Sequence, residues 1–124
     1  MSERGSVSIL VIAVLAALFF VAMGSADVAR VLVAASRAQT AADAAALAAA
    51  QTMALPAAGE VPSDLARSFA VRNGGTLERC ECEPQSFEAT VVVRMRVGRL
   101  FLVDDDRSVT ASAQAIVDLP SSAG

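Results

Sequence analysis

The chain has 124 residues and a formal net charge of −3, and it contains no histidine, tryptophan or tyrosine. All ten basic residues are arginine. This composition excludes a histidine base, a histidine-rich metal site and a lysine Schiff base. Hydrophobic residues make up 55% of the chain but aromatic residues only 4%, so the apolar content consists of small side chains. The mildly acidic balance argues against nucleic acid as a partner.

The first third of the chain contains one segment that is long and apolar enough to cross a membrane. Residues 5–26 are 22 consecutive residues without a charge, and a bilayer core of about 30 Å needs about 20 helical residues. Small residues around Ala26 also resemble a signal peptidase site, so cleavage there is the competing interpretation. Arg4 precedes the segment and Arg30 and Arg37 follow it, so the positive-inside count opposes a C-terminus outside the cytoplasm.

The helical pattern continues beyond this segment. Residues 27–55 contain no glycine or proline, so the sequence predicts one helix from about Ser6 to about Leu55. Asp27 and Arg30 are expected to pair where the helix leaves the bilayer. Two rows of alanine follow at four-residue spacing, and small residues in such rows allow close helix packing. We expect helices of other subunits to pack there, although a genome rich in alanine codons is the alternative explanation. The rows are Ala34, Ala38, Ala42, Ala46, Ala50 and Ala54, and Ala41, Ala45 and Ala49.

The residues around and after the apolar segment resemble a known family. Arg4–Gly5 opens the segment, Asp27–Arg30 closes it, and the run AQTAADAAALAAA occupies residues 38–50. The pattern is similar to the N-terminal segment of the TadE/TadG-like proteins of tight-adherence (Flp-type) pilus systems. In length it is closest to the short actinobacterial TadE-like proteins of helicase/secretion neighbourhoods. The resemblance covers about residues 4–55. It implies a membrane-anchored, pseudopilin-like component of a pilus or a type II/IV-like secretion apparatus. It also implies similar subunits as partners and a C-terminal domain outside the cytoplasmic membrane.

The same resemblance raises the question of processing at Gly5. Pilin-type precursors are cut after a glycine, and the fifth residue of the mature chain is usually glutamate. Cleavage after Gly5 would make Ser6 the first residue and Leu10 the fifth. A leucine in place of this glutamate is closer to the uncleaved TadG-like type. We therefore expect an N-terminus that is either intact or begins at Ser6. TadG-like proteins often carry a large extracellular domain, for which 124 residues leave no room.

The remainder of the chain differs from the helix in composition. Proline and glycine at 56–62 indicate a linker, which divides the chain into a helix at 1–55 and a small extracytoplasmic domain at 63–124. Within this domain the hydrophobic periodicity predicts a short helix and three strands. Their ranges are 63–72 for the helix, which Asn73–Gly75 ends, and 76–82, 86–97 and 108–118 for the strands. The expected fold is therefore α+β, a long pilin-like helix followed by a short helix and a three-stranded antiparallel sheet.

Few residues carry chemistry. Cys80 and Cys82 would face the same side of a strand. A disulfide between them is close to the upper limit of Cα separation, and two free thiols or pairing with another chain are the alternatives. A single CxC motif does not make a zinc site. Asp104–Asp106 lacks the spacing of a calcium loop and is interpreted as a solvated turn. We expect no catalytic, cofactor or metal site and no small-molecule substrate, hence a structural protein. A small secreted or membrane-tethered interaction protein is the alternative.

Overall fold

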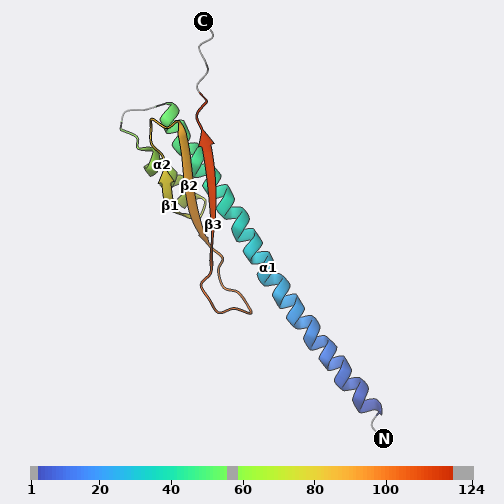
Figure 1. The fold of residues 1–124 in the computed structure, drawn as a ribbon. Helices are drawn as coiled ribbons and strands as arrows, with labels where there is room; N and C mark the ends of the chain where they lie inside the picture. Colours follow the sequence, from blue (N-terminus) through green and yellow to red (C-terminus); the bar gives the residue numbers. More distant parts are fainter. Residues whose placement is uncertain (1–2, 56–58, 119–124) are drawn as a thin grey trace.

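The structure is a computed structural model that describes residues 3–55 and 59–118. It contains two helices followed by a three-stranded sheet (Figure 1), as the sequence predicts for an α+β fold. The elements are α1 (Glu3–Ala54), α2 (Pro62–Arg72), β1 (Thr76–Glu81), β2 (Glu88–Arg96) and β3 (Ser108–Ile116). Residues 56–58 of the predicted linker lie outside the described residues.

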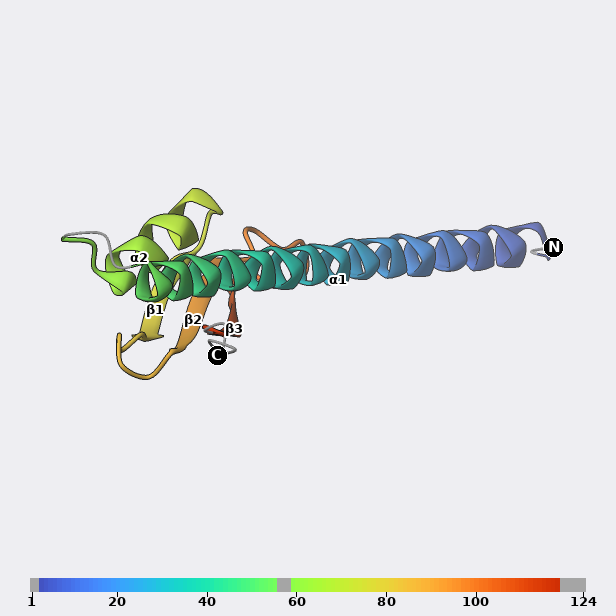
Figure 2. The same cartoon turned by 90° about the horizontal axis from the view of Figure 1, so that it is seen from above.

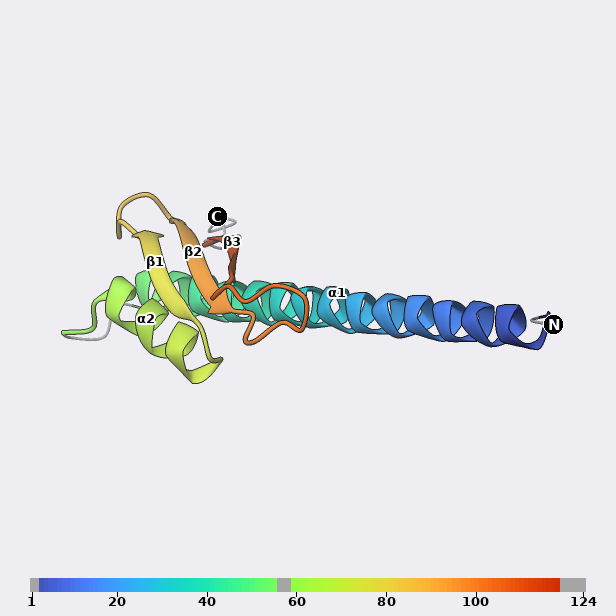
Figure 3. The ribbon, with the colours of Figure 1, turned by 90° about the horizontal axis from the view of Figure 1, so that it is seen from below.

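The first helix is one continuous rod. It has 52 residues, which corresponds to a length of roughly 78 Å. The prediction of one unbroken helix is confirmed, because every residue from Ser25 to Gln51 is helical. Figures 2 and 3 show that the rest of the described chain gathers around the C-terminal half of α1, while the N-terminal half extends alone.

The second helix has the start and the stop that its sequence indicates. Pro62 occupies the first turn, where its missing N–H is not needed. At the other end Gly74 adopts a positive φ of 81°. The backbone N–H of Gly74 donates to the carbonyl of Val71, and the N–H of Gly75 donates to the carbonyl of Ala70, both at 2.9 Å. These two bonds form a Schellman motif, which ends the helix and turns the chain into β1.

The sheet is an antiparallel meander with the order β1-β2-β3. In its centre Val91 of β2 pairs with Cys80 of β1 and with Ala113 of β3. The predicted alternation is confirmed in β2, where Ala89, Val91, Val93 and Met95 are all buried on one face. The opposite face carries mostly charged and polar side chains, together with Val92 and Ile116, and is partly or fully exposed.

The core lies between the inner face of the sheet, α2 and the C-terminal half of α1. It is built mainly of alanine and valine, so the backbones approach closely. Gly75 marks the tightest approach, because a Cβ atom there would lie 2.5 Å from Cγ1 of Val93 and 3.5 Å from Cβ of Ala41. The helix is thus part of the domain, and the domain in turn covers only half of the helix.

Candidate functional site

The N-terminal half of α1 is an apolar rod without a partner in the chain. Every residue from Gly5 to Ala22 is exposed, including the large side chains of Leu15, Leu18 and Phe19. In length and composition α1 could cross a membrane, and the most apolar part of it contains no buried residue. A folded protein rarely leaves so large an apolar surface bare in water, so this surface is a candidate binding surface.

The alanine rows in the other half are covered by the chain itself. Ala34, Ala38, Ala42, Ala46 and Ala50 are 6% exposed or less, and Ala41, Ala45 and Ala49 are fully buried. They pack against α2 and the inner face of the sheet. Within this chain these positions are covered, whereas Ala54 at the end of the first row is exposed, and the packing of helices of other subunits on the rows stays a prediction. The inner face of β3 presents mostly alanine and fits against the same helix.

A long loop between β2 and β3, residues 97–107, reaches back along α1 toward its bare half (Figures 1 and 3). The carboxylate of Asp27 accepts hydrogen bonds from two backbone N–H groups of the loop, from Phe101 at 2.8 Å and from Leu102 at 2.9 Å. Asp27 is only 8% exposed. Just before it, a Cβ atom on Gly24 would lie 3.6 Å from Leu102. The loop is therefore attached to α1 where the apolar segment ends.

Arg30 makes a second attachment one turn further along. Its guanidinium group donates a hydrogen bond to the carbonyl of Arg99 and lies 4.3 Å from the centroid of the Phe101 ring. The sequence led us to expect an ion pair between Asp27 and Arg30, but the ion pairs among the described residues do not include it. Both side chains instead bind the loop, because two free backbone N–H groups lie next to the carboxylate.

The hydrogen bonds shift the pKa of Asp27. The pKa lies below its ordinary value, chiefly because the N–H of Phe101 stabilises the charged carboxylate. The N–H of Leu102 and the positive charge of Arg30 act in the same direction, while partial burial opposes them. Asp27 is therefore a charged acceptor at neutral pH, and its charge favours the attached position of the loop.

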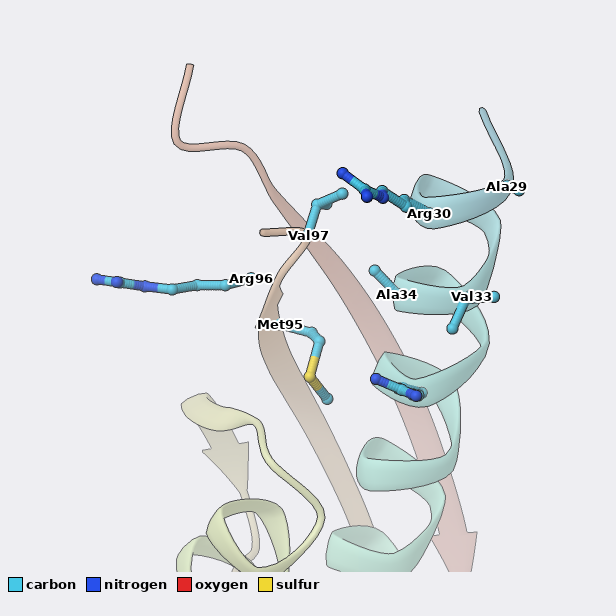
Figure 4. Close-up of a pocket in the computed structure, with 8 residues that line it drawn as sticks. Ala29, Arg30, Val33, Ala34, Met95, Arg96 and Val97 are labelled. Atoms are coloured by element: carbon cyan, nitrogen blue, oxygen red, sulfur yellow. The ribbon is translucent and has the colours of Figure 1, made fainter. Parts of the chain in front are cut away.

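A cleft of about 270 Å³ lies between α1 and the end of β2 (Figure 4). Arg30 and Ala34 line it from the helix, and Met95 and Val97 line it from the strand side, while Arg96 points away. The described residues that line the cleft offer cationic and apolar groups.

The two cysteines form a disulfide with each other. Cys80 and Cys82 have a Cα–Cα separation of 5.4 Å, which is inside the usual range. The sequence led us to expect a separation near the upper limit, as in an extended strand. The observed separation is shorter than that expectation.

The three consecutive aspartates lie in the exposed part of the β2–β3 loop. Asp106 is 3.9 Å from Arg96 in an exposed ion pair. In the described part of the chain no three side chains of the kinds that hold metals come together. The sequence did not predict the attachment of this loop to Asp27, although one signal was present: residues 100–103 are four apolar residues inside an otherwise polar turn.

The fold and these surfaces define a class of protein in which a small α+β domain is built on one half of a helix whose apolar other half is left bare. Residues 5–52 match a family model described as "Putative Flp pilus-assembly TadE/G-like". The first helix of the chain is thus similar to TadE/G-like proteins over these residues, and the resemblance found in the sequence is confirmed there. The description of that family connects it with pilus assembly. No curated protein and no solved structure matches the chain.

Proposed function

We propose that this chain is a membrane-anchored, pseudopilin-like structural component of a Tad/Flp-type pilus or a related type II/IV-like secretion apparatus. The observation that carries the proposal is the division of α1 into a bare apolar half and an embedded half. The short actinobacterial TadE-like proteins are the branch to which we assign it. Its partners are other pilin-like or secretion-apparatus subunits, which it contacts through the N-terminal helix.

The bare half of α1 favours lipid or a bundle of like helices as its surroundings. Residues 5–26 span about 33 Å as a helix, which matches the apolar thickness of a bilayer. Residues 5–26 also form the part of α1 that other subunits can reach, since the alanine rows of the other half are covered by the chain itself. A subunit of this kind rests in the membrane by its apolar half and presents its folded domain at the membrane surface.

The proposal places the domain outside the cytoplasm, in a single-pass arrangement. The disulfide between Cys80 and Cys82 supports this side, because disulfides persist in oxidising compartments. Arg30 and Arg37 oppose it through the positive-inside rule. Arg30 is engaged with the loop through Arg99 and Phe101, so its position has a structural reason that is independent of topology. Protease treatment of spheroplasts tests the side, and protection of the domain would show that it faces the cytoplasm.

Processing at the N-terminus belongs to the same proposal. Gly5 and Ser6 lie inside α1 and are exposed, and we expect the chain to be intact or to begin at Ser6. The mass of the membrane-extracted protein distinguishes these two forms.

The second candidate is a small interaction protein released by signal peptidase after Ala26. One observation favours it: the core begins at Ala34, so a chain that starts at Asp27 would keep the whole core. The unbroken helix through Ala26 favours the anchored form instead. A mature chain that begins at Asp27 would establish the released form.

Carbonate extraction of membranes tests the anchor with a matched pair of variants. Leu15 and Leu47 are both exposed leucines on α1, but Leu15 lies in the middle of residues 5–26 and Leu47 lies in the embedded half. An arginine at the centre of a span costs about 2.5–3.5 kcal/mol. The natural chain and Leu47→Arg should stay in the membrane pellet, and Leu15→Arg should be released in larger part. Recovery of most of the natural chain in the soluble fraction would overturn the anchor.

A further inference from the structure

The tip of the β2–β3 loop is apolar and exposed. Residues 100–103 read Leu-Phe-Leu-Val. Phe101 is 54% exposed and Leu102 is 53% exposed, although the loop is attached to α1. Arg99 precedes this tip and Asp104–Asp106 follows it. A solvated turn does not need four consecutive apolar residues, so the tip has a surface that the described chain leaves uncovered.

The position of the tip along the helix is fixed by three contacts. Asp27 accepts the N–H groups of Phe101 and Leu102, and Leu102 lies against Gly24. The guanidinium group of Arg30 lies over the Phe101 ring. Gly24 is within the last turn of the apolar segment, whose final residue is two positions later, about 3 Å along the axis. The tip is therefore level with the end of the segment, on its C-terminal side.

We propose that this loop tip inserts into the lipid interface beside α1 and forms a second membrane contact of the domain. The inference rests on the proposed function, because it requires residues 5–26 to span the bilayer. If they do, the side chains of Phe101 and Leu102 lie at the boundary between the acyl chains and the headgroups. The exposed apolar surface of the tip is then continuous with that of the span, and lipid covers both.

The charges around the tip fit this depth. Arg30 and Arg99 lie on the domain side of the apolar residues, where guanidinium groups can reach lipid phosphates while their stems stay apolar. Asp104–Asp106 marks the point where the loop returns to water. Arg99 and Arg107 leave the loop with a net charge of −1, which Arg96 at the end of β2 balances, so this end of the domain has no excess of positive charge. Contact with the bilayer should therefore depend on apolar insertion, and a zwitterionic lipid should suffice.

A second contact has a mechanical consequence. A domain held by one helix alone is free to tilt and to rotate about that helix. Insertion of the tip on one side of α1 removes this freedom, and it presents a defined side of the sheet to neighbouring subunits.

Single-tryptophan variants of the full chain test the inference, because the natural chain has neither tryptophan nor tyrosine and gives a dark background. Two variants report on the tip. They are Leu102→Trp and Phe101→Trp, and the second keeps an aromatic ring under Arg30. Leu18→Trp reports on the middle of the span, and Phe87→Trp reports on an exposed position at the opposite end of β2. Each variant is reconstituted in phosphatidylcholine vesicles, and its fluorescence is quenched with lipids brominated at different depths or with acrylamide from the water.

We expect Leu102→Trp and Phe101→Trp to have blue-shifted emission and to be quenched by lipid brominated near the headgroup. Leu18→Trp should be quenched by deeply brominated lipid, and Phe87→Trp by acrylamide alone. If Leu18→Trp behaves so but both tip variants are quenched by acrylamide alone, the inference is overturned while the anchor stands. If the tip is shielded from both quenchers, a protein surface covers it, and the lipid contact is again overturned. Failure of lipid to quench Leu18→Trp would instead overturn the anchor itself.

Discussion

Replacing Ala42 by leucine distinguishes packing within the chain from packing between subunits. Ala42 has no exposed surface and lies in the middle of the first alanine row. Its neighbours in the core come from α2 and from the inner face of the sheet. A leucine at this position must displace them, because its larger isobutyl group has no free volume to enter.

The size of the effect follows from this burial. Overpacking a well-packed core costs about 1–3 kcal/mol. The helix itself is unaffected, since leucine is nearly as good a helix former as alanine. A loss of about 2 kcal/mol changes the ratio of folded to unfolded domain by a factor of about 30, a large part of the stability of a small domain. We therefore expect Ala42→Leu to unfold the domain at lower denaturant concentration while α1 still inserts into the membrane.

The assay is urea-dependent proteolysis of the detergent-solubilised full chain without any partner subunit. Ala35→Leu is the matched control, because Ala35 is on the same helix but exposed. The control should have the midpoint of the natural chain, and Ala42→Leu a clearly lower one.

The opposite pattern would refute the reasoning. If Ala42→Leu is as stable as Ala35→Leu in isolation and loses only co-purification with other subunits, the row binds a neighbouring helix. The packing of the alanine rows on the chain's own sheet would then be the wrong arrangement for the assembled protein.

Two further predictions concern close contacts that the structure creates. Gly75→Ala should destabilise the domain by about 1–3 kcal/mol through overpacking, because the added Cβ meets Cγ1 of Val93. In urea unfolding, combining it with Val93→Ala should cost less than the sum of the two single changes, and strict additivity would exclude this clash as the cause. The second prediction is that the amide proton shifts of Phe101 and Leu102, followed by NMR in micelles, titrate together below the ordinary Asp pKa of 3.8. Because the pKa of Asp27 is depressed in the folded state, its stabilisation of the loop is complete above the ordinary value and is lost as the pH falls through the lower one. Asp27→Asn should abolish the titration, and a midpoint above 3.8 would contradict the attachment.

Much of the local structure could be read from the sequence because it depends on neighbours along the chain. The absence of glycine and proline after Asp27 predicts the continuous helix. The alternation of apolar and polar residues predicts β2 and β3 with the correct face toward the core. Asn73–Gly75 predicts the end of α2, since a glycine there can adopt a positive φ. The apolar segment and the alanine-rich run also carry the family resemblance that the match over residues 5–52 confirms.

Tertiary structure alone decided what these elements touch. Rows of alanine suit any flat partner, so their spacing could not distinguish a helix of another subunit from the alanine-rich face of β3. The attachment of the loop joins Asp27 to Phe101 and Leu102, which are more than 70 residues away, and no local pattern encodes a contact at that distance. The sequence by itself therefore determined an apolar helix and the elements of a small domain. The fold determined which half of that helix is used inside the chain and which half is left for the membrane or for other subunits, because only packing shows which surfaces are already covered.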